Sequence, residues 1–81
     1  MAKILFHADH IRFTNGVSEI ELDVADYRGC LAKIHSLYPE LQDDVLSRYM
    51  VTIDGVIIQS PFLEKLGPDS DLVFINKIAA G

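Results

Sequence analysis

The sequence is poor in several features that mark particular protein classes. Its 81 residues include no tryptophan, one cysteine, three prolines and five glycines. The single cysteine, Cys30, excludes a disulfide within the chain and is typical of a reducing compartment. No apolar run approaches the length of a membrane span, and the apolar start is too short for a signal peptide. We therefore expect a cytoplasmic domain that does not interact with a membrane.

Basic residues are also scarce. Seven Lys and Arg residues stand against twelve Asp and Glu residues, which gives a net charge of -5. Such a chain repels a phosphate backbone, and no basic cluster reverses this effect, so we do not expect nucleic acid as a partner. The acidic field suits a basic protein partner instead. With 49% hydrophobic and 23% charged residues, the composition is that of a globular chain rather than a disordered one.

Residue patterns near the N-terminus predict two strands. Residues 3–8 are rich in apolar side chains, and residues 19–24 alternate between acidic and apolar ones, which indicates a strand with one wet face. Between them, Asn15-Gly16 readily adopts positive φ angles, which favours a tight turn. The sequence therefore predicts a hairpin.

The spacing of apolar residues then changes to that of a helix. From Asp26, a candidate N-cap, they recur at three- and four-residue intervals as far as Tyr38, and Pro39 ends the pattern. Gly29 weakens this helix, and we expect its missing side chain to allow a close approach to the sheet. Residues 39–46 predict a short helical turn.

The second half of the chain predicts more strands. Residues 49–53 and 56–58 flank Asp54-Gly55, a strong two-residue turn, and residues 72–75 form a buried strand after a helical turn at 60–66. The resulting order predicts an α+β fold, the β-grasp or ubiquitin-like architecture. In it, a mixed sheet of four to five strands carries one main helix on one face. We expect residues 1–75 to form a single domain and residues 76–81 a flexible C-terminal tail.

A few side chains invite a chemical interpretation. His7, Asp9 and His10, with Cys30 or His35, contain metal-ligand atoms, but their spacing fits no strong metal motif, so we expect no metal site. Cys30 falls on the apolar face of the helix and is predicted to be an inert core residue. No nucleophile, base or phosphate loop is visible, so we expect neither a stand-alone enzyme nor a cofactor.

The outward face of the sheet is a candidate docking surface. Val73 and Ile75 point outward if Leu72 and Phe74 face the helix, and a register error of one residue would exchange the two sets. An apolar patch there would suit a partner protein. Ordinary scattered surface residues are an equally good explanation.

Three segments resemble those of one protein family. They are the helix exit Leu37-Tyr38-Pro39-Glu40-Leu41, the hairpin Ile53-Asp54-Gly55, and the closing strand 68–75 with the short tail to Gly81. In order and spacing, the whole chain resembles the ubiquitin-like sulfur carriers MoaD and ThiS. It is most similar to MoaD, the small subunit of molybdopterin synthase.

The resemblance implies a function for the chain end. In that family an activating adenylyltransferase (MoeB- or ThiF-like) uses ATP to adenylate the terminal glycine, here Gly81, and sulfur then converts it to a thiocarboxylate. A larger subunit (MoaE-like) receives the sulfur in molybdopterin-type cofactor biosynthesis. The residues that would enter the partner's channel are Lys77, Ile78, Ala79 and Ala80. The chain itself would be a carrier, or the non-catalytic small subunit of a sulfur-transfer enzyme.

The tail also departs from the family pattern. The chain ends in Ala80-Gly81 where the family has Gly-Gly, and Asn76-Lys77 replaces a pair that is often proline. The methyl group of Ala80 lies where a channel would be narrowest and restricts φ. An alternative therefore stays open, a non-conjugating ubiquitin-like interaction module that has lost carrier activity. The receiving pathway, whether for molybdenum cofactor, thiamine or another product, also stays open.

Overall fold

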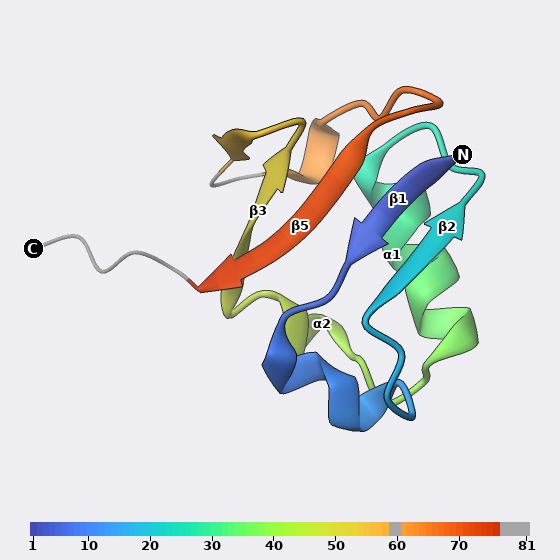
Figure 1. Cartoon of the computed structure of the whole chain (residues 1–81), viewed down its shortest axis with the longest axis vertical. Coiled ribbons are helices and arrows are strands. Elements are labelled where there is room, and N and C mark those ends of the chain that lie inside the picture. Colours follow the sequence, from blue (N-terminus) through green and yellow to red (C-terminus); the bar gives the residue numbers. More distant parts are fainter. Residues whose placement is uncertain (59–60, 77–81) are drawn as a thin grey trace, which may run out of the picture.

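The computed structural model describes residues 1–58 and 61–76, and five strands in this part of the chain form one sheet (Figure 1). The strands are β1 (Ala2–Leu5), β2 (Glu19–Leu22), β3 (Tyr49–Ile53), β4 (Val56–Ile58) and β5 (Asp71–Asn76). Their order across the sheet is β2-β1-β5-β3-β4. Strand β5 runs parallel to β1 and antiparallel to β3, so the sheet is mixed, as predicted.

One main helix covers a single face of this sheet. Helix α1 (Tyr27–Leu37) lies behind the strands in Figure 1, and α2 (Asp43–Leu46) is a single short turn. Two 3-10 helices complete the described elements, η1 (Ala8–Phe13) and η2 (Pro61–Leu63). Among residues 1–58 and 61–76, no helix has the length and apolar character needed to cross a membrane.

The start of α1 is held by the predicted cap. The Asp26 side chain accepts a hydrogen bond from the backbone N–H of Gly29 at 2.7 Å. A Cβ atom on Gly29 would lie 3.1 Å from this same carboxylate oxygen. The close approach that Gly29 allows is therefore to its own helix cap, and our expectation of a close approach to the sheet was wrong.

The core lies between α1 and the inner face of the sheet. Ile34 of α1 is fully buried, as are Ile4 and Leu72, which pair across β1 and β5. Phe74 is 2% exposed, and its ring stacks on that of Phe6 at a centroid distance of 6.2 Å. This packing fixes the register of β5, because its even-numbered residues must face the helix.

The connection between β1 and β2 differs from the prediction. Asn15 and Gly16 do have positive φ angles, 57° and 88°, but they follow η1 and do not join the strands directly. Strand β1 ends at Leu5 because the His7 side chain accepts a hydrogen bond from the N–H of Asp9 and begins η1. The β3–β4 turn is confirmed, with φ angles of 52° at Asp54 and 85° at Gly55.

Candidate functional site

Strand β5 presents a different set of side chains on each of its two faces. Leu72 and Phe74 are buried on the helix side, whereas Val73 and Ile75 are partly exposed on the opposite face. The strand ends at Asn76, which pairs with Tyr49 at the start of β3. The predicted orientation of these side chains is thus present in the structure, while the docking role of Val73 and Ile75 stays a prediction.

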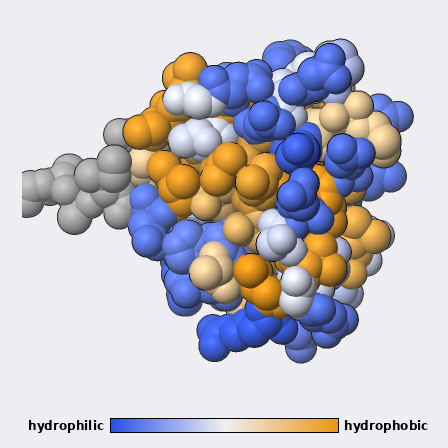
Figure 2. Space-filling model, in the orientation of Figure 1, coloured by the Kyte–Doolittle hydropathy of each residue, from blue (hydrophilic) through white to orange (hydrophobic). Residues whose placement is uncertain are grey.

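Apolar side chains from neighbouring strands extend the outer face around β5. Leu5 of β1 lies opposite Val73, and Met50 of β3 lies opposite Ile75. Ile57 of the edge strand β4 is 49% exposed. Figure 2 looks onto this face and shows hydrophobic residues gathered at its centre, with hydrophilic ones around them. We call Leu5, Met50, Ile57, Val73 and Ile75 the outer patch.

The predicted tail cannot be placed relative to this patch. Lys77, Ile78, Ala79, Ala80 and the acceptor Gly81 lie outside the described residues. Asn76, which the sequence assigned to the flexible tail, is instead the last residue of β5 and is held there by its pairing with Tyr49. Five further residues reach at most roughly 18 Å from that point when fully extended.

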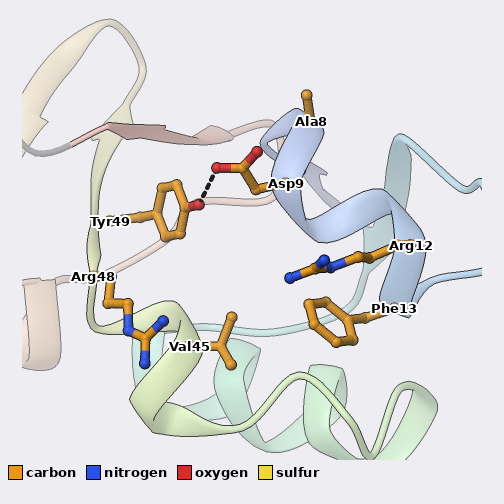
Figure 3. Close-up of a pocket in the computed structure, with 7 residues that line it drawn as sticks. All are labelled: Ala8, Asp9, Arg12, Phe13, Val45, Arg48 and Tyr49. Atoms are coloured by element: carbon orange, nitrogen blue, oxygen red, sulfur yellow. Dashed lines mark hydrogen bonds between the residues drawn. The ribbon is translucent and has the colours of Figure 1, made fainter.

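A pocket of about 490 Å³ lies beside the end of β5 (Figure 3). Its walls come from η1, from α2 and from the start of β3, and Tyr49 links it to Asn76 by strand pairing. Its apolar lining consists of Ala8, Phe13 and Val45. Sequence analysis did not find this pocket, because it depends on η1, whose first residue, Ala8, was assigned to a strand and whose other residues were assigned to no element.

One side of the pocket is formed by a hydrogen-bonded pair. The Tyr49 hydroxyl donates to Oδ2 of Asp9 at 2.5 Å, across a gap of forty residues in the sequence. This hydrogen bond lowers the pKa of Asp9 and raises the pKa of Tyr49. Asp9 is therefore ionised and Tyr49 neutral at physiological pH.

Two arginines flank this pair. Arg12 extends from η1 with its guanidinium 4.9 Å from the centre of the Phe13 ring, and Arg48 precedes β3 on the other side of the pocket (Figure 3). Neither guanidinium forms an ion pair with a carboxylate in residues 1–58 or 61–76. The pocket is thus locally cationic in a protein whose net charge is -5.

A buried histidine supports the pocket from inside. The His10 ring is fully buried and packs edge-on against Tyr49, at a centroid distance of 4.4 Å, and against Phe74, at 5.4 Å. Neither ring nitrogen has a hydrogen-bond partner among the described residues. Burial lowers the pKa of His10, so its ring is neutral at physiological pH.

Of the metal-ligand candidates of the sequence, the structure places His7 beside Asp9, with 3.5 Å between Nδ1 and Oδ2. His35 faces Asp43, with 3.0 Å between Nε2 and Oδ1, and Cys30 is buried in the core. Burial raises the pKa of the Cys30 thiol to about 12, which keeps it protonated and unreactive. Within the described part of the chain, no three His, Cys, Asp or Glu side chains are grouped so as to hold a metal ion.

Solved structures provide the comparison that decides the fold. The structure of SAMP1 from Haloferax volcanii matches with a TM-score of 0.72 at 16% sequence identity, over 99% of this chain and 98% of that one. The small archaeal modifier protein 1 from Methanosarcina acetivorans matches with the same TM-score at 17% identity, over 99% and 95% of the two chains. The fold is the β-grasp.

The comparisons support the architecture and leave the finer assignment to a proposal. No protein-family model matches the sequence, and no curated protein matches it. One of the two solved neighbours is described as a small archaeal modifier protein, and at this level of identity the likeness concerns the fold alone. The predicted α+β fold, with one main helix on a mixed sheet, is confirmed.

Proposed function

We propose that the chain is a carrier whose Gly81 carboxylate is activated as an acyl adenylate and then converted to a thiocarboxylate. The observation that carries the proposal is the β-grasp fold, shared over nearly the whole length with small modifier proteins. The sequence resemblance to sulfur carriers supports the same chemistry. The chain would work with a MoeB- or ThiF-like adenylyltransferase and donate its sulfur to a larger, MoaE-like subunit in molybdopterin-type biosynthesis.

The chemistry needs nothing catalytic from the chain itself. A carboxylate oxygen of Gly81 attacks the α-phosphorus of ATP and releases pyrophosphate, which turns a poor electrophile into an activated mixed anhydride, the acyl adenylate. Hydrosulfide then attacks the carbonyl carbon, AMP leaves, and a proton is released. The products are a thiocarboxylate, which is a soft nucleophile, and AMP. The outer patch would hold the chain on its partners while the tail reaches the active site.

Intact-mass spectrometry tests this proposal directly. We expect the full chain, incubated with the activating enzyme, ATP and sulfide, to gain the mass difference between one sulfur and one oxygen atom. Ala80→Gly restores the family's terminal Gly-Gly and serves as a positive control. If Ala80→Gly reacts and the natural chain does not, the carrier function is excluded.

A second acceptor follows from the names of the solved neighbours, which describe modifiers. The same adenylate also reacts with an amine on another protein, which forms an amide and releases AMP and a proton. The readout is then a covalent adduct of higher mass that survives treatment with hydroxylamine. Hydroxylamine cleaves a thioester but leaves an amide intact. A thiocarboxylate without such adducts supports the sulfur carrier, and adducts support the modifier.

The interaction module also makes a distinct prediction. Ala80 in place of glycine is the observation that favours it. If binding alone is the function, deletion of residues 79–81 leaves the affinity for the partner unchanged. Surface plasmon resonance with the full chain and the shortened chain measures this, and a large loss of affinity contradicts the module.

A further inference from the structure

The pocket between η1, α2 and β3 contains two guanidinium groups, and neither forms an ion pair with a carboxylate of the described chain. Arg12 lies in η1 and Arg48 in the turn between α2 and β3, and both line the same volume. A guanidinium presents a planar set of donors that matches the two oxygens of a carboxylate. Asp9, the acidic residue among those that line the pocket, already accepts a hydrogen bond from the Tyr49 hydroxyl.

The charge of the lining selects the kind of anion. Two guanidinium groups and the ionised Asp9 leave one net positive charge in the pocket. A singly charged anion balances this charge. A doubly charged phosphate would place excess negative charge beside Asp9, in a protein that is already acidic.

The walls of the pocket add a requirement for an apolar group. The Phe13 ring, Val45 and Ala8 line the space next to the cations. A volume of about 490 Å³ falls in the range of small-ligand sites, where apolar walls provide affinity and a few polar groups fix orientation. The lining therefore fits an anion with a hydrophobic body better than a bare inorganic ion.

We propose that this pocket binds a carboxylate group carried on a small apolar or aromatic body, with Arg12 and Arg48 as its cationic ligands. Two sources present this chemistry, a free carboxylic acid and an acidic side chain beside an apolar residue of a partner protein. The site lies next to Asn76, from which the chain continues towards Gly81. The proposal concerns binding only and does not depend on any reaction at Gly81.

An NMR titration of the ¹⁵N-labelled full chain tests the site with 3-phenylpropionate as the probe. We expect saturable shifts of the backbone amides of Ala8, Asp9 and Tyr49. The neutral analogue 3-phenylpropanamide should bind at least about tenfold more weakly, since it lacks the charge-assisted hydrogen bonds. Phenyl phosphate should also bind more weakly at neutral pH. Equal binding of acid and amide would overturn the proposal.

The arginines are tested by substitution with a matched control. Arg12→Gln and Arg48→Gln should each weaken the binding of 3-phenylpropionate by about tenfold. Arg28 of α1 is the control, because its guanidinium also lies over an aromatic ring, 5.0 Å from the centre of Phe62, but it does not line the pocket. Arg28→Gln should change the affinity less than about twofold. If Arg28→Gln weakens the binding of 3-phenylpropionate as much as Arg48→Gln does, the assignment of Arg12 and Arg48 as the cationic ligands is contradicted.

The source of the carboxylate is distinguished by a second pair of probes. An acetylated and amidated Leu-Glu-Phe peptide is compared with its Leu-Gln-Phe counterpart in the same titration. Binding of the glutamate peptide alone identifies a partner's side chain, and binding of the free acid alone identifies a small molecule. If neither the peptide nor the acid gives saturable shifts at the pocket, the proposal of a carboxylate site fails. The carrier function is tested separately, by the mass change at Gly81.

Discussion

At the scale of single residues, His10 combines full burial with two unpartnered nitrogens. Phe6, Tyr49 and Phe74 surround its ring, and none of them offers a hydrogen bond to it. A buried polar group without a partner costs about 1–3 kcal/mol. His10 therefore lowers the stability of the fold that it helps to pack.

Replacement of this ring tests that cost. We expect His10→Leu, which keeps a similar volume, to raise the free energy of unfolding at pH 7 by about 1 kcal/mol, because the lost aromatic contacts offset part of the gain. Urea denaturation of both chains measures the difference. A variant that is less stable than the natural chain at pH 7 would show that the packing of the ring outweighs its unmet polar groups.

The same residue makes a prediction about pH. In the folded chain, burial and then the nearby His7 lower the pKa of His10 below its ordinary value of 6.5, and the neighbouring Asp9 opposes this shift only in part. Below pH 6.5 the unfolded chain therefore binds a proton that the folded chain does not, so stability falls as pH falls towards the folded pKa. We expect part of the loss between pH 7.5 and 5 to disappear in His10→Leu. Equal losses in the two chains would exclude His10 as the cause.

At the scale of elements, the first turn of α1 couples a capping residue to a glycine. The Gly29 N–H is bound by Asp26, and the space that a Cβ would take on Gly29 is limited by the same carboxylate. Alanine is favoured over glycine within a helix by about 1 kcal/mol. Here that gain is opposed by crowding at the cap.

A double-mutant cycle measures this coupling. We expect Asp26→Ala to cost about 1 kcal/mol through loss of the cap. Gly29→Ala should then stabilise the Asp26→Ala chain by about 1 kcal/mol and the natural chain by clearly less. Ser36→Ala, at an exposed position of α1, serves as the control and should give the same effect in both backgrounds. Urea denaturation of the variants provides the free energies, and additive effects of Asp26 and Gly29 would contradict the crowding.

At the scale of the whole molecule, the elements set by local patterns were predictable. Helix α1 has a cap at Asp26 and a stop at Pro39, and the β3–β4 turn has its Asp54-Gly55 pair. Both signals lie within a few residues of the structure that they specify. Together with the strand patterns, they were enough to predict the sheet and its helix.

The pocket was not predictable in the same way. The His10 ring of η1 packs against Tyr49 and Phe74, and these residues are distant from it in the sequence. Arg12 and Arg48 meet at one site only because the fold places α2 and β3 beside η1. Periodicity does not carry such information, since it describes the faces of an element and not the element's neighbours.

Strand β5 has one face that packs in the core and an opposite face that belongs to the proposed docking surface. It is the central strand, paired with both β1 and β3, and its successive side chains serve opposite faces. Phe74 is 2% exposed against the helix, whereas Val73 belongs to the partly exposed outer patch. The two neighbours therefore form a matched pair for testing which face supports the fold.

Alanine substitutions at these two positions should have very different effects. Phe74→Ala is expected to lower the free energy of unfolding by about 3–5 kcal/mol, because it leaves a cavity beside Phe6 and His10. A chain of this size has a total stability of about 4–12 kcal/mol, so this loss removes a large share of it. Val73→Ala should cost only about 1 kcal/mol and should instead weaken binding of the activating enzyme. Urea denaturation measures the effect on stability, and surface plasmon resonance measures the effect on partner affinity. Ser36→Ala, an exposed polar substitution, is the control for binding. If Val73→Ala loses no more affinity than Ser36→Ala, the outer patch is not part of the docking surface.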